Sequence, residues 1–113
     1  METGMNGGLS QEYIEKQLQT VENIFLKLGA SELEINEKNR QKFGQRKIFK
    51  YNGKYYRADC LHFDESDKVY ISLSCTDDEQ YANVGLLDDV DAFEIDLSEQ
   101  SIENKIREMF EGR

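Results

Sequence analysis

Residues 46–63 read RKIFKYNGKYYRADCLHF, in which Asn52-Gly53 separates two runs rich in aromatic residues. Both central residues of a two-residue type I′ turn need a positive φ, which asparagine and glycine adopt more readily than other residues. The pattern therefore predicts a β-hairpin that turns at this dipeptide. A turn of this length puts Tyr51 opposite Lys54 and sets the register of the whole hairpin.

A second turn is predicted at residues 64–67, which read DESD and precede another strand-like run at 68–75. A four-residue turn puts Cys60 opposite Ile71. The combined register gives one mostly apolar face, which we expect to be the core side of an antiparallel sheet. That face carries Phe49, Tyr51, Tyr56, Ala58, Cys60, His62, Val69, Ile71, Leu73 and Cys75.

Two amphipathic helices are predicted near the ends of the chain. Ser10 is a good N-cap for the first helix, and Gly29 can adopt the left-handed conformation that ends it. Between them, apolar residues recur at steps of three and four, as one face of a helix requires. Ser98 and Gly112 bound the second helix in the same way.

Three shorter elements are also predicted. A capping box between Thr76 and Glu79 indicates a helix over residues 77–83. Alternating polar and apolar residues indicate short strands near 32–36 and 90–95.

The chain is predicted to form one domain behind a short leader. Residues 1–8 contain three glycines and no periodic apolar residues, so we expect them to be disordered. A second methionine at Met5 leaves open whether residues 1–4 are native or added. Residues 9–113 are expected to form a single α+β domain. In it, an antiparallel meander of about four or five strands packs against the N- and C-terminal helices.

Charge is strongly segregated along the chain. Residues 38–57 contain eight bases and no acid, whereas residues 64–99 contain twelve acids and one base. The net charge of the whole chain is −9. Such an acidic balance disfavours the coating of nucleic acid or of an anionic membrane, and it favours a partner with a basic surface. Surfaces of opposite sign suit association with a partner but indicate no chemistry.

The compartment is predicted to be the cytoplasm. No apolar run reaches the roughly twenty residues that span a bilayer, and the first residues lack the pattern of a secretory signal. Cys60 and Cys75 share a sheet face but lie four residues out of register, which is too far for a disulfide. We therefore expect two free thiols in a reducing environment.

We expect no enzymatic activity, metal or cofactor. His62 lies two residues from Cys60 on the same strand face, but no third group is suggested that would orient a nucleophile–base pair. A histidine at the edge of the core, bonded to the backbone, is the predicted role. The acids of residues 88–96 do not match a calcium loop, because the fifth position counted from Asp89 is Phe93.

The preferred hypothesis is a protein-binding module that docks a basic partner through an acidic surface. Small, acidic, cytoplasmic domains of this build are similar to bacterial immunity proteins and other stoichiometric inhibitors, a likeness of size and charge alone. Those proteins often present an acidic surface to a basic, nuclease-type target. We expect a monomer or a weak homodimer. The predicted acidic ridge consists of Asp77, Asp78, Glu79, Asp88, Asp89, Asp91, Glu94 and Asp96.

The alternative hypothesis is the binding of single-stranded nucleic acid through the basic, aromatic segment 38–57. Basic side chains interleaved with stacking rings are what such a surface requires. The same rings and cations would equally suit a protein interface. The pattern does not decide whether residues 37–45 cover this outer face of the sheet. The candidate contacts on it are Lys50, Tyr55, Arg57, Phe63 and Tyr70.

Overall fold

The computed structural model describes residues 10–34, 46–62 and 68–112, except for the side chain of His62. Predictions for residues 1–9, 35–45 and 63–67, including Phe63 and the disordered leader, lie outside this part of the chain. The elements in order are α1 (Gln11–Lys27), β1 (Ser31–Glu32), β2 (Phe49–Tyr51), β3 (Lys54–His62), β4 (Val69–Thr76), α3 (Glu79–Asn83), β5 (Asp88–Glu94) and α4 (Glu99–Phe110).

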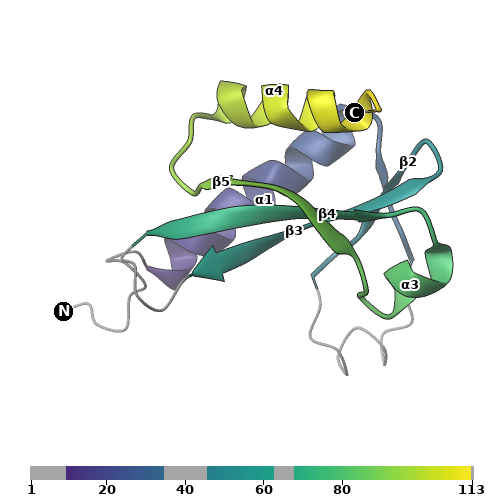
Figure 1. Cartoon of the computed structure of the whole chain (residues 1–113). Coiled ribbons are helices and arrows are strands. Elements are labelled where there is room, and N and C mark those ends of the chain that lie inside the picture. Colours follow the sequence, from purple (N-terminus) through teal and green to yellow (C-terminus); the bar gives the residue numbers. More distant parts are fainter. Residues whose placement is uncertain (1–9, 35–45, 63–67, 113) are drawn as a thin grey trace.

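The described strands form one antiparallel sheet in the order β1-β2-β3-β4-β5, which is a simple meander. Helices α1 and α4 cover one face of the sheet, and α3 lies at the end of β4 (Figure 1). The predicted α+β architecture, with N- and C-terminal helices on an antiparallel sheet, is confirmed. The edge strands of the sheet are β1, of two residues, and β5, of seven residues, and only β5 carries a row of acids.

The hairpin forms as predicted around Asn52-Gly53. Asn52 has φ 52° and Gly53 has φ 81°, so both turn residues occupy the left-handed region. The predicted register is present throughout: Phe49 pairs with Tyr56, Tyr51 with Lys54, and Cys60 with Ile71. This register sends alternate side chains to the helical face and fixes the composition of the core.

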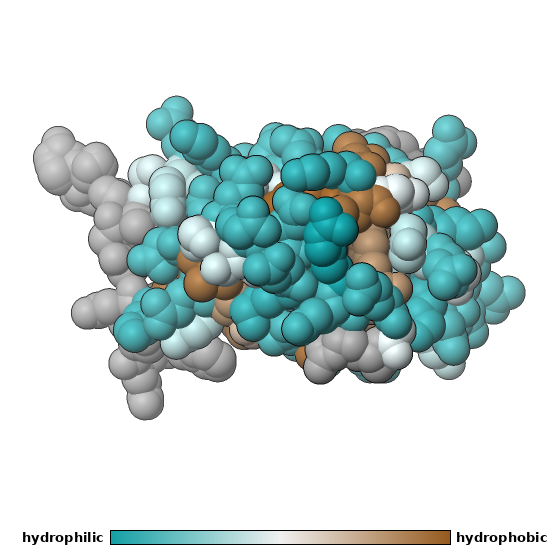
Figure 2. Space-filling model, turned by 90° about the horizontal axis from the view of Figure 1, so that it is seen from above, coloured by the Kyte–Doolittle hydropathy of each residue, from teal (hydrophilic) through white to brown (hydrophobic). Residues whose placement is uncertain are grey.

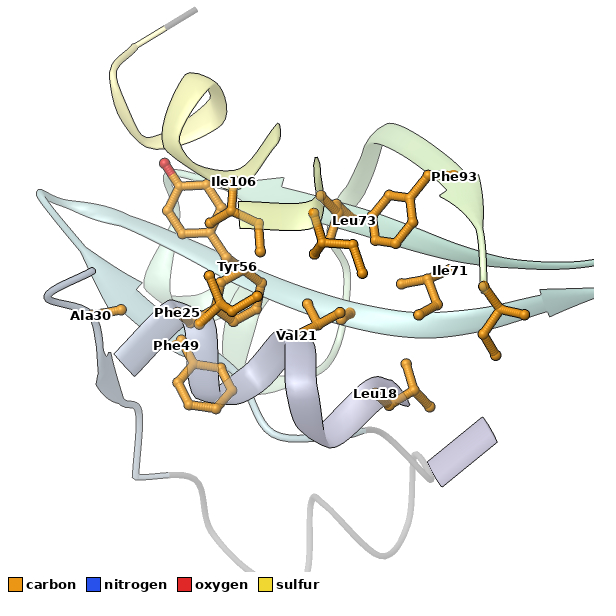
Figure 3. Close-up of a cluster of buried hydrophobic side chains, with 14 of the residues drawn as sticks. Leu18, Val21, Phe25, Ala30, Phe49, Tyr56, Ile71, Leu73, Phe93 and Ile106 are labelled. Atoms are coloured by element: carbon orange, nitrogen blue, oxygen red, sulfur yellow. The ribbon is translucent and has the colours of Figure 1, made fainter. Parts of the chain in front are cut away.

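The main core lies between the sheet and the two long helices. Phe25 of α1 is fully buried at its centre (Figure 3). Its ring centroid is 5.3 Å from that of Phe49, 5.8 Å from that of Phe110 and 6.5 Å from that of Tyr56. One aromatic cluster therefore joins both helices to the β2–β3 hairpin. The predicted apolar face supplies the sheet side of this core.

A second, smaller cluster lies on the opposite face of the sheet. Ile48, Tyr55 and Ala82 are buried there, and Leu33 and Leu87 pack against them. Ala82 belongs to α3, so this short helix covers part of the outer face. Sequence periodicity placed Tyr55 on the outer face but did not indicate that α3 would cover it.

Helix capping agrees with prediction at both long helices and differs at the short one. Ser10 and Ser98 accept hydrogen bonds from backbone amides of the first turns of α1 and α4. The predicted role of Thr76 as N-cap of the short helix is wrong. Asp78 is the N-cap of α3, and Thr76 instead accepts a hydrogen bond from the Asp78 amide at 3.2 Å. The first strand begins earlier than predicted: β1 shares only Glu32 with the predicted range 32–36, of which residues 35 and 36 lie outside the described part of the chain.

Glu22 is a buried acid on the core-facing side of α1, with 3% of its surface exposed. Arg46, which precedes β2, donates from Nε to Glu22 Oε2 at 3.2 Å. The other guanidinium nitrogens of Arg46 donate to both carboxylate oxygens of Glu15 at 3.0 Å. This three-residue network ties α1 to the beginning of β2.

Glu103 is a second buried acid, on α4. It accepts a hydrogen bond from Lys27 of α1 at 2.8 Å and another from Arg107 at 2.7 Å. These two hydrogen bonds, of which that from Lys27 has the larger effect, lower the pKa of Glu103 below its usual range. The Lys27–Glu103 pair thus joins α1 to α4 at the edge of the core.

Seen from above, over α4, the molecule is largely hydrophilic, with hydrophobic side chains gathered in limited patches (Figure 2).

Candidate functional site

The predicted acidic ridge lies along one end and one edge of the sheet. Its members come from three adjoining segments: the turn that leads into α3, the edge strand β5, and Asp96 just beyond that strand. Seven of its eight residues are exposed, and Asp91 is half-buried. Segment 77–96 contains these eight acids and no base. The acids therefore form one run of like charge along the sequence, and most of them are exposed at this end and edge of the sheet.

Two of the ridge acids are held by hydrogen bonds. Asp78 caps α3 and accepts from the Gln80 amide at 2.9 Å. Asp89 Oδ1 accepts from the hydroxyls of Ser72 at 3.2 Å and Ser74 at 2.9 Å, both of which are buried on β4. Asp89 is thereby positioned on the outer face of the sheet by the neighbouring strand.

Two further ridge acids form ion pairs. Asp91 Oδ2 lies 3.8 Å from Lys105 Nζ of α4, and Glu94 Oε2 lies 3.1 Å from Lys68 Nζ. The side chains of the remaining four acids make no hydrogen bond or ion pair within the described residues: Asp77, Glu79, Asp88 and Asp96. All four are exposed, so an external partner can reach them.

Strand β5 contains a β-bulge in the middle of the ridge. Leu73 pairs with Asp91 and Ser74 pairs with Asp89, so Val90 is an extra residue with no partner on β4. The side chain of Val90 is 53% exposed as a result. Asp91 Oδ1 also accepts from the Ala92 amide at 2.8 Å. The bulge and this local hydrogen bond both disfavour the addition of another strand at the edge.

Exposed apolar side chains interrupt the acidic ridge. Tyr81 of α3 is 54% exposed, and Leu86 of the α3–β5 connection is 62% exposed. With Val90 they are three of the four large hydrophobic residues that are exposed in the described part of the chain, the fourth being Leu26. The sequence prediction missed them, because Val90 was assigned to a strand and neither Tyr81 nor Leu86 was singled out. The one available signal was the placement of all three between acids.

The outer-face residues of the alternative hypothesis are largely engaged within the fold. Lys50 is exposed and Tyr70 half-buried, but Tyr55 is only 6% exposed beneath α3. Arg57 donates to the Gly85 carbonyl at 3.1 Å. Its Nε lies 2.8 Å from Asp59 Oδ2, an ion pair whose angles do not form a hydrogen bond. Neither the ring nor the guanidinium is thus presented for stacking.

A hollow adjoins the ridge at the end of the sheet where β3 begins and β4 ends. Its volume is about 290 Å³. The side chains that line it come from β3, β4, β5 and α4: Lys54, Tyr56, Cys75, Val90, Asp91 and Met109. A shallower depression of about 250 Å³ adjoins it and adds Thr76, Asp77 and Asp88 to the lining.

The Tyr56 hydroxyl and the Cys75 thiol, whose residues line the hollow, are neutral at physiological pH. Burial, followed by the nearby thiol of Cys75, raises the pKa of Tyr56 to about 12. Burial also raises the pKa of Cys75, although Lys54 and a hydrogen bond with Tyr56 act in the opposite direction. Because the thiolate is the reactive form of cysteine, this protonated thiol is a poor nucleophile. Cys60 is likewise a free thiol whose pKa is raised by burial.

Within the described residues, no group of three histidine, cysteine or carboxylate side chains is arranged to hold a metal ion. The helices of the same residues include none that is long and apolar enough to cross a membrane. No family model, curated protein or solved structure matches the chain. The function must therefore be argued from the surface itself.

Proposed function

We propose that this chain is a non-enzymatic protein-binding module whose acidic ridge docks a basic partner. The observation that supports this proposal is that large apolar side chains are exposed among the acids of the ridge. Tyr81, Leu86 and Val90 are exposed within a segment of eight acids and no base. Apolar and aromatic anchors supply affinity at the centre of an interface, and surrounding charges supply partner selection and speed of association.

The form of this function that best fits the chain is a stoichiometric inhibitor or immunity-type protein. Such a protein acts by covering a basic surface on its target. It needs a scaffold that holds its binding side chains in place, and it needs no catalytic group. The ridge is built on an edge strand and a capped helix, which hold its side chains in defined positions. A cytoplasmic location belongs to the same proposal, because both cysteines are free thiols.

The proposal is tested by reversing the acids that the fold does not use. Asp77, Glu79 and Asp88 are exposed and make no hydrogen bond or ion pair with the described residues, so the D77K/E79K/D88K variant should fold normally. The control is E34K/E108K/E111K, which changes the net charge of −9 by the same amount at exposed positions elsewhere. Both variants and the native chain are used to capture partners from lysate of the source organism.

The expected result is one stoichiometric, basic protein that is retained by the native chain and by the control but lost by the ridge-reversed variant. Its affinity should fall at least tenfold between about 0.05 M and about 0.5 M salt, because screening weakens exposed charge pairs. Equal retention by all three proteins would exclude the ridge as the binding surface. Recovery of nuclease-sensitive RNA or DNA would instead favour the basic hairpin.

A further inference from the structure

The hollow beside the ridge is lined by both apolar and charged side chains. Val90 and Met109 contribute to its lining, together with the buried ring of Tyr56 and the neutral thiol of Cys75. Side chains of this kind contact alkyl groups favourably. These four residues therefore suit the hydrocarbon part of a ligand and offer no charged group to it.

The charged residues around the hollow are mostly acidic. Asp91 lines the hollow itself, and Asp77 and Asp88 line the adjoining depression. Lys54 is the one cation among the described residues that line either of them. The side chains of Asp77 and Asp88 make no hydrogen bond or ion pair within the described residues, whereas Asp91 is paired with Lys105. Two carboxylates beside the hollow thus remain available to a ligand.

We propose that this hollow is the anchor site for one lysine or arginine side chain of the basic partner. Such a side chain can bury its alkyl stem against an apolar wall while its cation stays near water and acids at the rim. The volume of about 290 Å³ is sufficient for a single long side chain. This inference rests on the proposed function, and it names the place on the ridge where the partner is held.

Lys54 provides a test of whether the hollow prefers a cation or an anion. Its ammonium group repels a cation in the hollow, so its neutralisation should strengthen cation binding, while neutralisation of Asp88 should weaken it. An anionic occupant would reverse both effects. The matched control is Glu79→Gln, which removes one exposed acid of the ridge that does not line the hollow.

The probe is butylguanidinium, titrated into the full chain and followed by proton–nitrogen NMR. We expect saturable shifts of the Thr76, Val90 and Asp91 amides, with a dissociation constant on the order of 10 mM for so small a ligand. Asp88→Asn should weaken binding roughly two- to fivefold, and Lys54→Gln should strengthen it by a similar factor. Glu79→Gln should leave the affinity unchanged.

Val90→Arg provides a second variant, at a position exposed enough to tolerate it. Its guanidinium can occupy the hollow from within the molecule, so butylguanidinium should no longer shift the Thr76 amide. Equal binding of pentanoate or pentanol to the native chain, or opposite signs for the Asp88 and Lys54 variants, would overturn the anchor site. Loss of the captured partner on ridge reversal, without any effect of Val90→Arg on its affinity, would overturn the anchor and leave the proposed function standing.

Discussion

Replacement of Arg46 by methionine should destabilise the fold more than replacement of both Arg46 and Glu22 by methionine. Glu22 is 3% exposed, and Arg46 is its hydrogen-bonding partner. Burial raises the pKa of Glu22, because desolvation of its carboxylate outweighs the attraction of Arg46. Arg46 differs: burial lowers its pKa, but Glu15 and Glu22 together outweigh that effect and raise it. The arginine thus pairs with two carboxylates, whereas the buried glutamate pairs with one arginine and is otherwise favoured only by the charge of Lys47.

The expected loss of stability depends on whether one or both partners of the buried ion pair are removed. Removal of one partner from a buried pair leaves an uncompensated charge and costs about 3–5 kcal/mol. We expect about 3 kcal/mol for Arg46→Met, because 23% of the arginine side chain is exposed and water can partly replace it. The double variant leaves no buried charge at this site, so it should lie within about 1 kcal/mol of the native protein.

The cost of Arg46→Met should also depend on pH. A raised pKa means that the folded protein binds the Glu22 proton more tightly than the unfolded chain does, so this stability is lost as pH rises from 4.5 through the folded pKa. Loss of Arg46 raises that pKa further. The cost should therefore be full near pH 7 and fall to about 1 kcal/mol below about pH 4, where Glu22 is protonated in both states.

The assay is urea unfolding followed by far-ultraviolet circular dichroism, at both pH values, for the native protein and the two variants. The reasoning is refuted if the double variant is as unstable as Arg46→Met near pH 7, or if the cost of the single variant does not change with pH. Unchanged slopes of free energy against urea would show that the variants alter stability and not the extent of unfolding.

Three further predictions follow from the core. Phe25→Ala should cost about 3–5 kcal/mol in urea unfolding, since it removes a fully buried ring that contacts three others; a cost below about 1.5 kcal/mol would contradict the described packing. In an alkaline titration followed by ultraviolet absorbance, Tyr56 should ionise near pH 12, and Tyr56→Phe should remove that late step. Gly29→Ala should cost about 1–2 kcal/mol, because φ is 110° and the added Cβ would lie 3.3 Å from Tyr51 Cε1; thermal unfolding would contradict this if the midpoint did not fall.

Local chemistry made the sheet predictable. Asn52-Gly53 specifies its turn type, and the turn type specifies the register, so the core face could be read from alternate residues. The short helix was less predictable, because Thr76 and Asp78 are both good caps and lie two residues apart. Only the backbone path from β4 decides that Asp78 is used.

The buried acids and the hollow required tertiary information. Glu22 lies four residues after Leu18 and three before Phe25, so its place on the apolar face was visible in the spacing. Nothing in the spacing indicated that Arg46, distant in the sequence, would meet it. The hollow likewise depends on how the end of α4 approaches β5 and on the bulge at Val90, neither of which is encoded in a local pattern.

The acids on the bulged edge of β5 affect both self-association and the proposed binding of a partner. An edge strand with an exposed valine is a site at which two copies of a chain can pair. Here a second copy would bring its own Asp88 and Asp89 against the first, and like charges across an interface oppose association. A basic partner meets the opposite situation, because the same carboxylates attract it toward the exposed apolar groups. The acids that oppose self-association are therefore the ones that, on the proposed function, would guide the partner to Val90 and the hollow beside it.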